Sequence, residues 1–264
     1  GDELAAGRPP LWNPHLAGGL PFLAAGQHGL LYPLAYPLIR LLPPERALGW
    51  LAALNLWLAG LGLYALGRAL RLGRPAATFM GLAATLSPLM VVNAVFPMIQ
   101  AGLTWIPWLL AAIYRLTETG PRGRPALLAA GQALQPSSPP ASSSSPEAHT
   151  ETPLAWETST IGPSRQAMAW LLVLAAALVL MALAGHPEAY LQGLLVAAAF
   201  GLWRLAGLAR AAGGRRSLWV GAWMLAAGVV GVLGGMVQLL PLLELARSSF
   251  RRGAASYEEG VSWA

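Results

Sequence analysis

The residues of this sequence that could do chemistry fall into three groups, and each group borders a long apolar run. One group lies in an uncharged stretch near the start, interrupted by proline and glycine, whose candidate binding residues are Trp12, Asn13, His15, Gln27, His28 and Tyr32. A second is the tripeptide His186-Pro187-Glu188, and a third is an arginine run that includes Arg247 and Arg251. Carboxylates and histidines can accept a proton, and the planar fork of arginine binds two phosphate oxygens at once. Together the groups could bind an anionic molecule and move a proton.

The composition indicates a membrane protein. Of 264 residues, 56% are hydrophobic and only 11% are charged, whereas soluble domains carry about 25% charged residues. The net charge of +6 comes from arginine alone, because the chain has no lysine. Without lysine there is no phosphate-binding loop of the nucleotide-binding type, and without cysteine there is no disulfide or thiolate metal site. No carboxylate-rich metal motif and no nucleic-acid motif is visible, so we expect neither partner.

Charge-free intervals locate the membrane spans. A helix needs roughly 20 apolar residues to cross about 30 Å of hydrocarbon. We therefore expect an all-α fold, a polytopic bundle with spans at residues 47–67, 76–96, 100–116, 167–185, 189–208 and 218–243. The span at 189–208 tolerates Arg204 only if that side chain reaches an interface. We interpret Asn55, Asn93 and Gln238 as interhelical hydrogen-bonding residues, and the small residues of 228–236 as sites of close helix packing.

The arginines predict the orientation of the spans. Those that follow the first, third and fifth spans are Arg68, Arg71, Arg74, Arg115, Arg122, Arg124, Arg165, Arg204, Arg210, Arg215 and Arg216, whereas the connections at 97–99 and 186–188 hold none. Because basic loops stay on the cytoplasmic side, we expect residues 1–46, 186–188 and 244–264 on the outer face. Arg247 and Arg251 break this rule. An anionic ligand would explain them, and so would anchoring to lipid head groups.

These considerations divide the chain into five parts. Residues 1–46 form an outer-face segment, re-entrant or lying in the interface with short helical pieces, and 47–117 form three spans. Residues 118–165 are rich in serine and proline and are predicted to be disordered, because they cannot bury enough apolar area to offset their ordering entropy. Three more spans follow at 166–243, and 244–264 return to the outer face.

Each polar group has a plainer alternative interpretation. The polar residues of the first segment would be costly in apolar surroundings unless they line a cavity or face water, but they could instead satisfy the backbone of an interfacial loop. His186 and Glu188 could simply cap the turn between two spans. Glu244 is expected to pair with Arg247 at i,i+3.

Five motifs, in order along the chain, resemble those of the YfhO family of bacterial membrane proteins. The motifs are "GRPPLWNPHLAGGLPFLAAGQHGLLYPLAYPLIRLLPPERAL", "LAGLGLYALGRALRLGRPAA", "TWIPWLLAAI", "AGHPEAYLQ" and "VQLLPLLELARSSFRRGAASYEEG". Within the first motif the matching residues are Gly7, Leu11, Trp12, Asn13, Pro14, Gly19, Pro21, Gln27, Tyr32 and Pro33, with either Ala24 or Ala25. The resemblance covers nearly the whole chain apart from the serine- and proline-rich part.

The resemblance implies a glycosyltransferase of the GT-C class in the bacterial cell membrane. Such proteins transfer a sugar from a polyprenyl-phosphate carrier to a cell-envelope glycan or lipid acceptor on the outer face, and no further cofactor is expected. The family's acid lies upstream of the W-N-P motif, after a first transmembrane helix that this sequence lacks. Asp2 and Glu3 are the acids ahead of Trp12, and Glu188 is the other carboxylate that we predict to be catalytic. A transporter or a non-catalytic membrane scaffold is the alternative, because transporters also carry broken segments beside their spans.

Overall fold

The chain folds into a helical bundle. A computed structural model describes residues 11–14, 19–25, 29, 31–118 and 163–248, and all statements about structure refer to these residues. The helices are α2 (Phe22–Ala25), α3 (Ala35–Leu41), α4 (Pro44–Ala69), α5 (Arg74–Thr85), α6 (Pro88–Val92), the 3-10 turn η1 (Asn93–Val95), α7 (Pro97–Thr104), α8 (Ile106–Leu116), α10 (Arg165–Leu183), α11 (Pro187–Ala212) and α12 (Gly214–Ser248). The predicted disordered part falls almost wholly outside the described residues.

Prolines decide where most of these helices begin. A proline stands at the first or second position of α4, α5, α6, α7, α8 and α11, where its fixed φ suits the helix and its missing N–H is no loss. Serine side chains cap two of the helices: Ser87 accepts a hydrogen bond from the N–H of Met90 at the start of α6, and Ser164 accepts one from that of Ala167 at the start of α10. The same prolines that interrupt the apolar runs of the sequence therefore mark helix boundaries.

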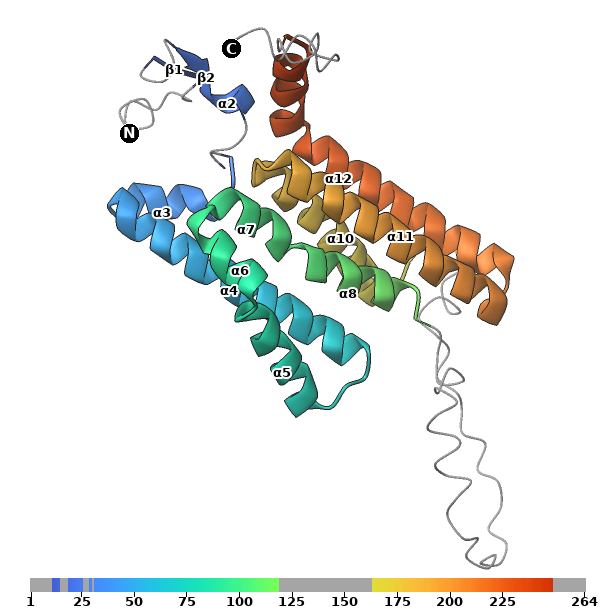
Figure 1. The fold of residues 1–264 in the computed structure, drawn as a ribbon. Coiled ribbons are helices and arrows are strands. Elements are labelled where there is room, and N and C mark those ends of the chain that lie inside the picture. The colour runs from blue at the N-terminus through green and yellow to red at the C-terminus, as the bar shows by residue number, and fades with distance from the viewer. Residues whose placement is uncertain (1–10, 15–18, 26–28, 30, 119–162, 249–264) are drawn as a thin grey trace, which may run out of the picture.

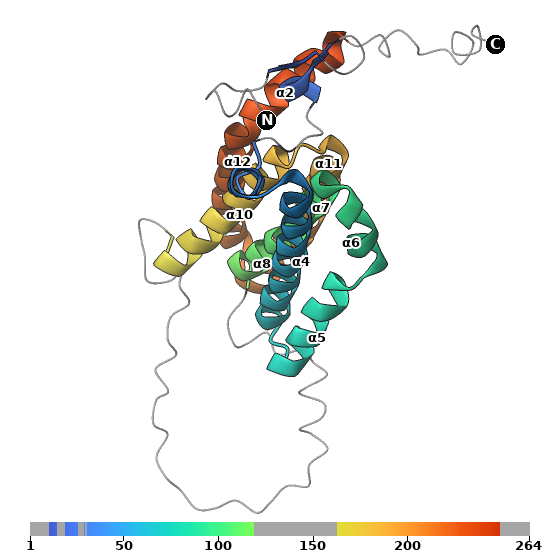
Figure 2. The same cartoon turned by 90° about the vertical axis from the view of Figure 1, so that its left-hand side faces the viewer.

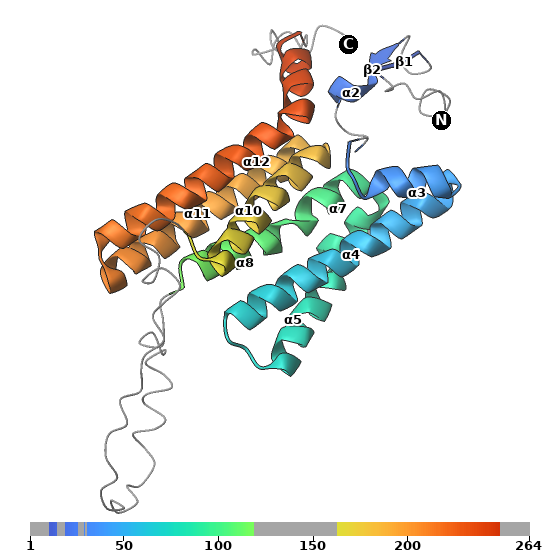
Figure 3. The ribbon, with the colours of Figure 1, turned by 180° about the vertical axis from the view of Figure 1, so that it is seen from behind.

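The helices form two sides that meet at α8. Seen from behind, α10, α11 and α12 lie side by side, and α4 with α5 lies on the other side (Figure 3). Helix α8 packs against both α4 and α10 (Figure 1). Glycines bring α12 close to α10: a Cβ atom at Gly231, Gly234 or Gly235 would lie 2.6–2.8 Å from side chains of α10. The predicted role of this glycine-rich stretch in close packing is confirmed.

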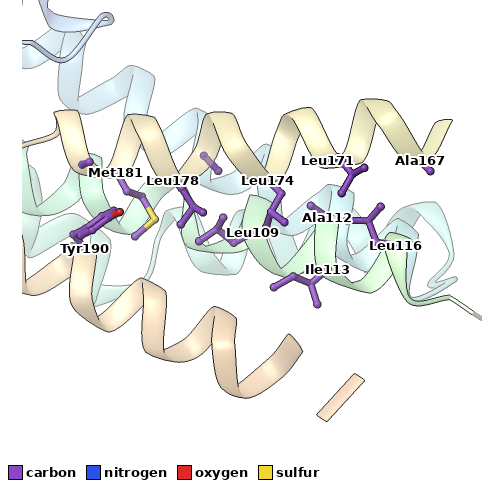
Figure 4. Packing of buried hydrophobic residues seen from close by; sticks show 12 residues of the cluster. Leu109, Ala112, Ile113, Leu116, Ala167, Leu171, Leu174, Leu178, Met181 and Tyr190 are labelled. Atoms are coloured by element: carbon purple, nitrogen blue, oxygen red, sulfur yellow. The ribbon is translucent and has the colours of Figure 1, made fainter. Parts of the chain in front are cut away.

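The main hydrophobic core lies between α8, α10 and α11. Figure 4 shows Leu109 and Leu116 of α8 facing a row of side chains on α10, Ile113 on the side of α8 nearer α11, and Tyr190 of α11 closing one end. A second, smaller core joins Tyr32, Ala35, Leu51, Ala101 and Ala184. Trp105, at the junction of α7 and α8, packs against both cores.

Four helices are long and apolar enough to span a membrane. They are Glu45–Ala69, Arg165–Leu183, Pro187–Ala212 and Gly214–Arg247, and they match four of the predicted spans. The pair α5 and α6–η1 would supply a fifth, but it bends by 41°, since Pro88 cannot donate to the carbonyl four residues before it. The predicted span at 100–116 is built from α7 and α8, which break at Trp105, two residues before Pro107. The count of six spans stays a prediction.

The first segment contains a small β-hairpin as well as short helices. Strand β1 (Trp12–Asn13) pairs with β2 (Leu20–Pro21), with Trp12 opposite Pro21. Gly19 has φ +120°, and a Cβ atom there would lie 2.8 Å from the indole carbon Cε2 of Trp12. Only glycine combines this φ with so close an approach to the ring. The W-N-P and G-x-P parts of the first motif thus meet in one turn.

Candidate functional site

The two ends of the bundle differ in their side chains. One end, here called the cavity end, carries Tyr32, the start of α7, the turn between α10 and α11, and the last part of α12. The other, the arginine end, carries the α4–α5 turn, the last residues of α8 and the α11–α12 turn. All three candidate groups have members among the described residues, and Tyr32, His186 and Arg247 all belong to elements at the cavity end.

A cavity of about 170 Å³ opens at the cavity end. Four parts of the chain form it: the segment before and within α3, the first half of α4, the start of α7, and the end of α10. Its lining residues are Gly29, Tyr32, Ala35, Ile39, Leu48, Leu51, Pro97, Met98, Ala101 and Ala184. Apart from the hydroxyl of Tyr32 these side chains are apolar, so the cavity suits a hydrocarbon group rather than a charged one.

Tyr32 joins three elements through its hydroxyl. The Oη atom donates to Oδ1 of Asn55 on α4 at 2.9 Å and accepts from Nε1 of Trp105 at 3.0 Å. The side chain is 1% exposed, so the ring lines the cavity while the hydroxyl is directed into the protein. The sequence predicted Tyr32 at a polar edge facing a substrate. Its hydroxyl is instead already paired with two protein groups.

Burial also fixes the protonation state of Tyr32. Loss of solvent raises the pKa of this phenol well above its usual value, and the hydrogen bond from Trp105 lowers it by a smaller amount. The phenol is therefore neutral at physiological pH and acts as a positioning group. It does not serve as a base.

Helix α7 extends this network. The hydroxyl of Thr104 lies 2.8 Å from the carbonyl of Gln100 and 3.3 Å from that of Asn55. Nε2 of Gln100 donates to the carbonyl of Met90 at 3.4 Å. Asn55, Gln100 and Thr104 are each 0% exposed, so neutral hydrogen bonds deep in the bundle connect α4, α6 and α7.

His186 and Glu188 have different roles in the turn between α10 and α11. Nδ1 of His186 accepts a hydrogen bond of 3.1 Å from the N–H of Ala189, which makes His186 the N-cap of α11. This is the capping role that the sequence left open as the alternative. Glu188 lies in the first turn of α11 and is exposed, and a carboxylate is favoured at that position by the helix dipole. Of the candidate bases, Glu188 is the described one that solvent can reach.

The last part of α12 packs against α2, the short helix that follows the N-terminal hairpin. Figures 1 and 2 both show α2 beside this part of the helix, and Nε2 of Gln238 donates to the carbonyl of Leu23 at 3.1 Å. Gln238 therefore makes an interelement bond, as predicted, although its partner is α2. Arg247 lies in the last turn of α12 and is exposed.

Charged side chains connect the elements of the arginine end. The carboxylate of Glu118 accepts from Arg71 at 3.0 Å and from Arg115 at 3.3 Å. Arg204 donates from Nε to Oγ1 of Thr117 at 3.0 Å and from Nη2 to its carbonyl at 3.1 Å. Its guanidinium also lies 4.3 Å from the centre of the Tyr114 ring. Arg204 therefore caps the end of α8, in addition to any contact with an interface.

The structure thus places six of the predicted site residues: Trp12, Asn13, Tyr32, His186, Glu188 and Arg247. Asp2, Glu3, His15, Gln27, His28 and Arg251 lie outside the described residues. Trp12, 57% exposed, is in the hairpin and does not line the cavity. Asn93 does not make the predicted interhelical bond, because its Nδ2 donates to the carbonyl of Leu89 in the turn just before it.

Sequence reasoning missed three members of the network, Gln100, Thr104 and Trp105. A signal was present, because "IQAGLTWIP" places two uncharged polar side chains and an indole directly before a proline in an apolar run. A proline there predicts a helix break, and a break exposes backbone groups that polar side chains can satisfy.

Among the described residues, no group of three histidine or acidic side chains could hold a metal ion. Comparisons with protein-family models, curated proteins and solved structures found no match for this chain.

Proposed function

We propose that this chain is a membrane-embedded, glycosyltransferase-like protein. It would transfer a sugar from a polyprenyl-phosphate carrier to a cell-envelope glycan or lipid acceptor on the outer face. The observation that carries the proposal is the apolar cavity at the cavity end, whose lining includes Gly29, Tyr32 and Ala35 of the first YfhO-like motif and Ala184 of the fourth. A bundle that spans the membrane through about six helices, with the first segment re-entrant at its outer face, is part of the proposal.

Each part of the proposed reaction can be assigned to described residues. The cavity takes a portion of the prenyl chain, since its lining is apolar. The Glu188 carboxylate accepts the proton of the acceptor hydroxyl, whose oxygen attacks the anomeric carbon. The bond between that carbon and the phosphate oxygen breaks, and the prenyl phosphate leaves with its electron pair. Arg247 offers positive charge to the leaving phosphate, and Asp2 and Glu3 remain alternative bases.

The test uses the full chain in lipid nanodiscs with a radiolabelled polyprenyl-phosphate sugar. Glu188→Gln should abolish transfer and leave donor binding intact, because only the proton acceptor is lost. Glu45→Gln is the matched control, since Glu45 also follows a proline in the first turn of a helix at the same end. Arg247→Gln should weaken donor binding. If the wild-type protein neither binds nor turns over the donor, the proposal is wrong.

A transporter is the second candidate, favoured by the helix breaks at Trp105 and between α5 and α6. Interrupted helices of this kind border substrate sites in transporters. Proteoliposomes loaded with the same labelled donor distinguish the two functions. Movement of unchanged donor across the bilayer, without transfer to an acceptor, would favour transport.

A further inference from the structure

Two buried polar atoms of the network at the cavity end have no hydrogen-bond partner. They are Nδ2 of Asn55, a donor, and Oε1 of Gln100, an acceptor. Both side chains are 0% exposed, and leaving a polar group unpaired in such a place destabilises the fold. Buried polar groups in proteins are nearly always satisfied, so each of these atoms requires a partner.

The existing hydrogen bonds determine which atom of each side-chain amide has no partner. Oδ1 of Asn55 accepts from Tyr32, whose hydroxyl already accepts from Trp105. Rotating the Asn55 amide would place its NH₂ against the Tyr32 hydroxyl and leave that hydroxyl's proton without its acceptor. Rotating the Gln100 amide would likewise remove the bond from Nε2 to the Met90 carbonyl. The unpaired atoms are therefore one donor and one acceptor.

Thr104 brings the two residues to the same place. Its hydroxyl lies within 3.3 Å of the carbonyls of both Asn55 and Gln100, so α4 and α7 approach each other at these positions. A molecule between them must accept from an amide NH₂ and donate to an amide oxygen. A metal cation fails the first requirement, and an inorganic anion fails the second.

We propose that a buried water molecule binds between α4 and α7, accepting from Nδ2 of Asn55 and donating to Oε1 of Gln100. Water is small enough, and buried waters typically make about three hydrogen bonds to groups of this kind. It completes a neutral chain from Trp105 through Tyr32, Asn55, the water and Gln100 to the Met90 carbonyl. The chain links the first segment, α4, α7 and α6, and it holds Tyr32 at the wall of the cavity. This site does not depend on the proposed transferase activity.

Radiolytic hydroxyl labelling of the full chain in nanodiscs tests the site. Hydroxyl radicals formed from an ordered internal water modify side chains beside it even when these are shielded from bulk solvent. Tyr32 should therefore be modified despite its burial, whereas Leu109, 0% exposed within the main core, should not be.

Two substitutions assign the labelling to this water. Asn55→Leu and Gln100→Met each remove one of the two atoms that bind it, and each should reduce the modification of Tyr32 several-fold. Gln100→Met nearly conserves side-chain volume, so it stays informative if Asn55→Leu does not fold. Asn93→Leu is the matched control, because Asn93 is only half-buried and its amide is bonded to its own turn. Absence of Tyr32 modification in the wild-type protein, as expected if the two amides bond directly, would overturn the proposal. Labelling that neither variant changes would do the same.

Discussion

The two ends of the bundle are held together by different chemistry. At the arginine end, charged groups bond to one another or to helix carbonyls, as Glu118 does with two arginines and Arg204 does with Thr117. At the cavity end the connecting groups are a phenol, an indole, amides and a hydroxyl, all neutral. Charges pair well near solvent, but burying them is expensive.

The difference shows what each end can tolerate. Arg71 is largely exposed, with a relative side-chain exposure of 57%, so its ion pair contributes little stability on its own. The neutral network at the cavity end lies in a closed interior, where each bond is hard to replace by water. We expect the cavity end to respond more strongly to substitution.

The largest effect should come from Tyr32→Ala. It removes a side chain that is 1% exposed and leaves Asn55 and Trp105 without their hydrogen-bond partner. The free energy of unfolding should therefore fall by about 3–5 kcal/mol. Tyr32→Phe keeps the ring and should lose about 1 kcal/mol. Denaturant titration in detergent micelles, followed by circular dichroism, measures both. Equal losses for the two variants would show that the ring contributes nothing beyond the hydroxyl.

The stability of the cavity end should also depend on pH, because Tyr32 can lose a proton. The pKa of Tyr32 is raised in the folded protein by burial, so the unfolded chain loses this proton first as pH rises. Stability from this group is complete below the ordinary phenol pKa of about 10 and then falls by up to roughly 1.4 kcal/mol per pH unit. The decline should be smaller in Tyr32→Phe. An identical alkaline decline in both proteins would contradict the prediction.

Arg204→Met tests the charged end. The substitution removes two hydrogen bonds at the end of α8 and the contact with the Tyr114 ring, and we expect a loss of about 1–2 kcal/mol. Arg210→Met, in the exposed last turn of the same helix, is the control and should change stability little. Thermal unfolding in the same detergent compares the two. A loss as large as that of Tyr32→Ala would reverse the ranking of the ends.

The smallest effect concerns Arg71, which has φ +64° at the end of α4. Glycine is favoured in this left-handed conformation, so Arg71→Gly relieves strain while losing the Glu118 ion pair. Arg71→Ala loses the ion pair and keeps the strain. We expect the glycine variant to be more stable than the alanine variant by about 1 kcal/mol. Equal stabilities would mean that the strain is relaxed by a shift of the turn.

The helices were largely predictable from the sequence, and the polar contacts were not. Apolar runs bounded by arginines located α4, α10, α11 and α12, because hydrophobic length is a local property of the chain. The break at Trp105 follows from Pro107. The prediction of one continuous span at 100–116 relied on the apolar run and neglected the effect of this proline. The side chain of Asn55 was correctly assigned to a contact between elements.

The partner of Asn55 could not be inferred in the same way. Tyr32 and Asn55 are 23 positions apart, and Tyr32 and Trp105 are 73 apart. No periodicity relates such positions, since their meeting depends on how three elements pack. For the same reason Tyr32 was expected to face a substrate, because its residue type fits an open polar edge as well as a buried connection.

The bond from Gln238 to Leu23 joins residues 215 positions apart. Ribosomes add about 5–20 residues per second, so roughly 10–40 s pass between synthesis of α2 and synthesis of the part of α12 that binds it. During this interval α2 has no docking partner on α12, because the intervening helices are still being synthesised. The order of synthesis therefore leaves this side of the cavity end to be assembled last.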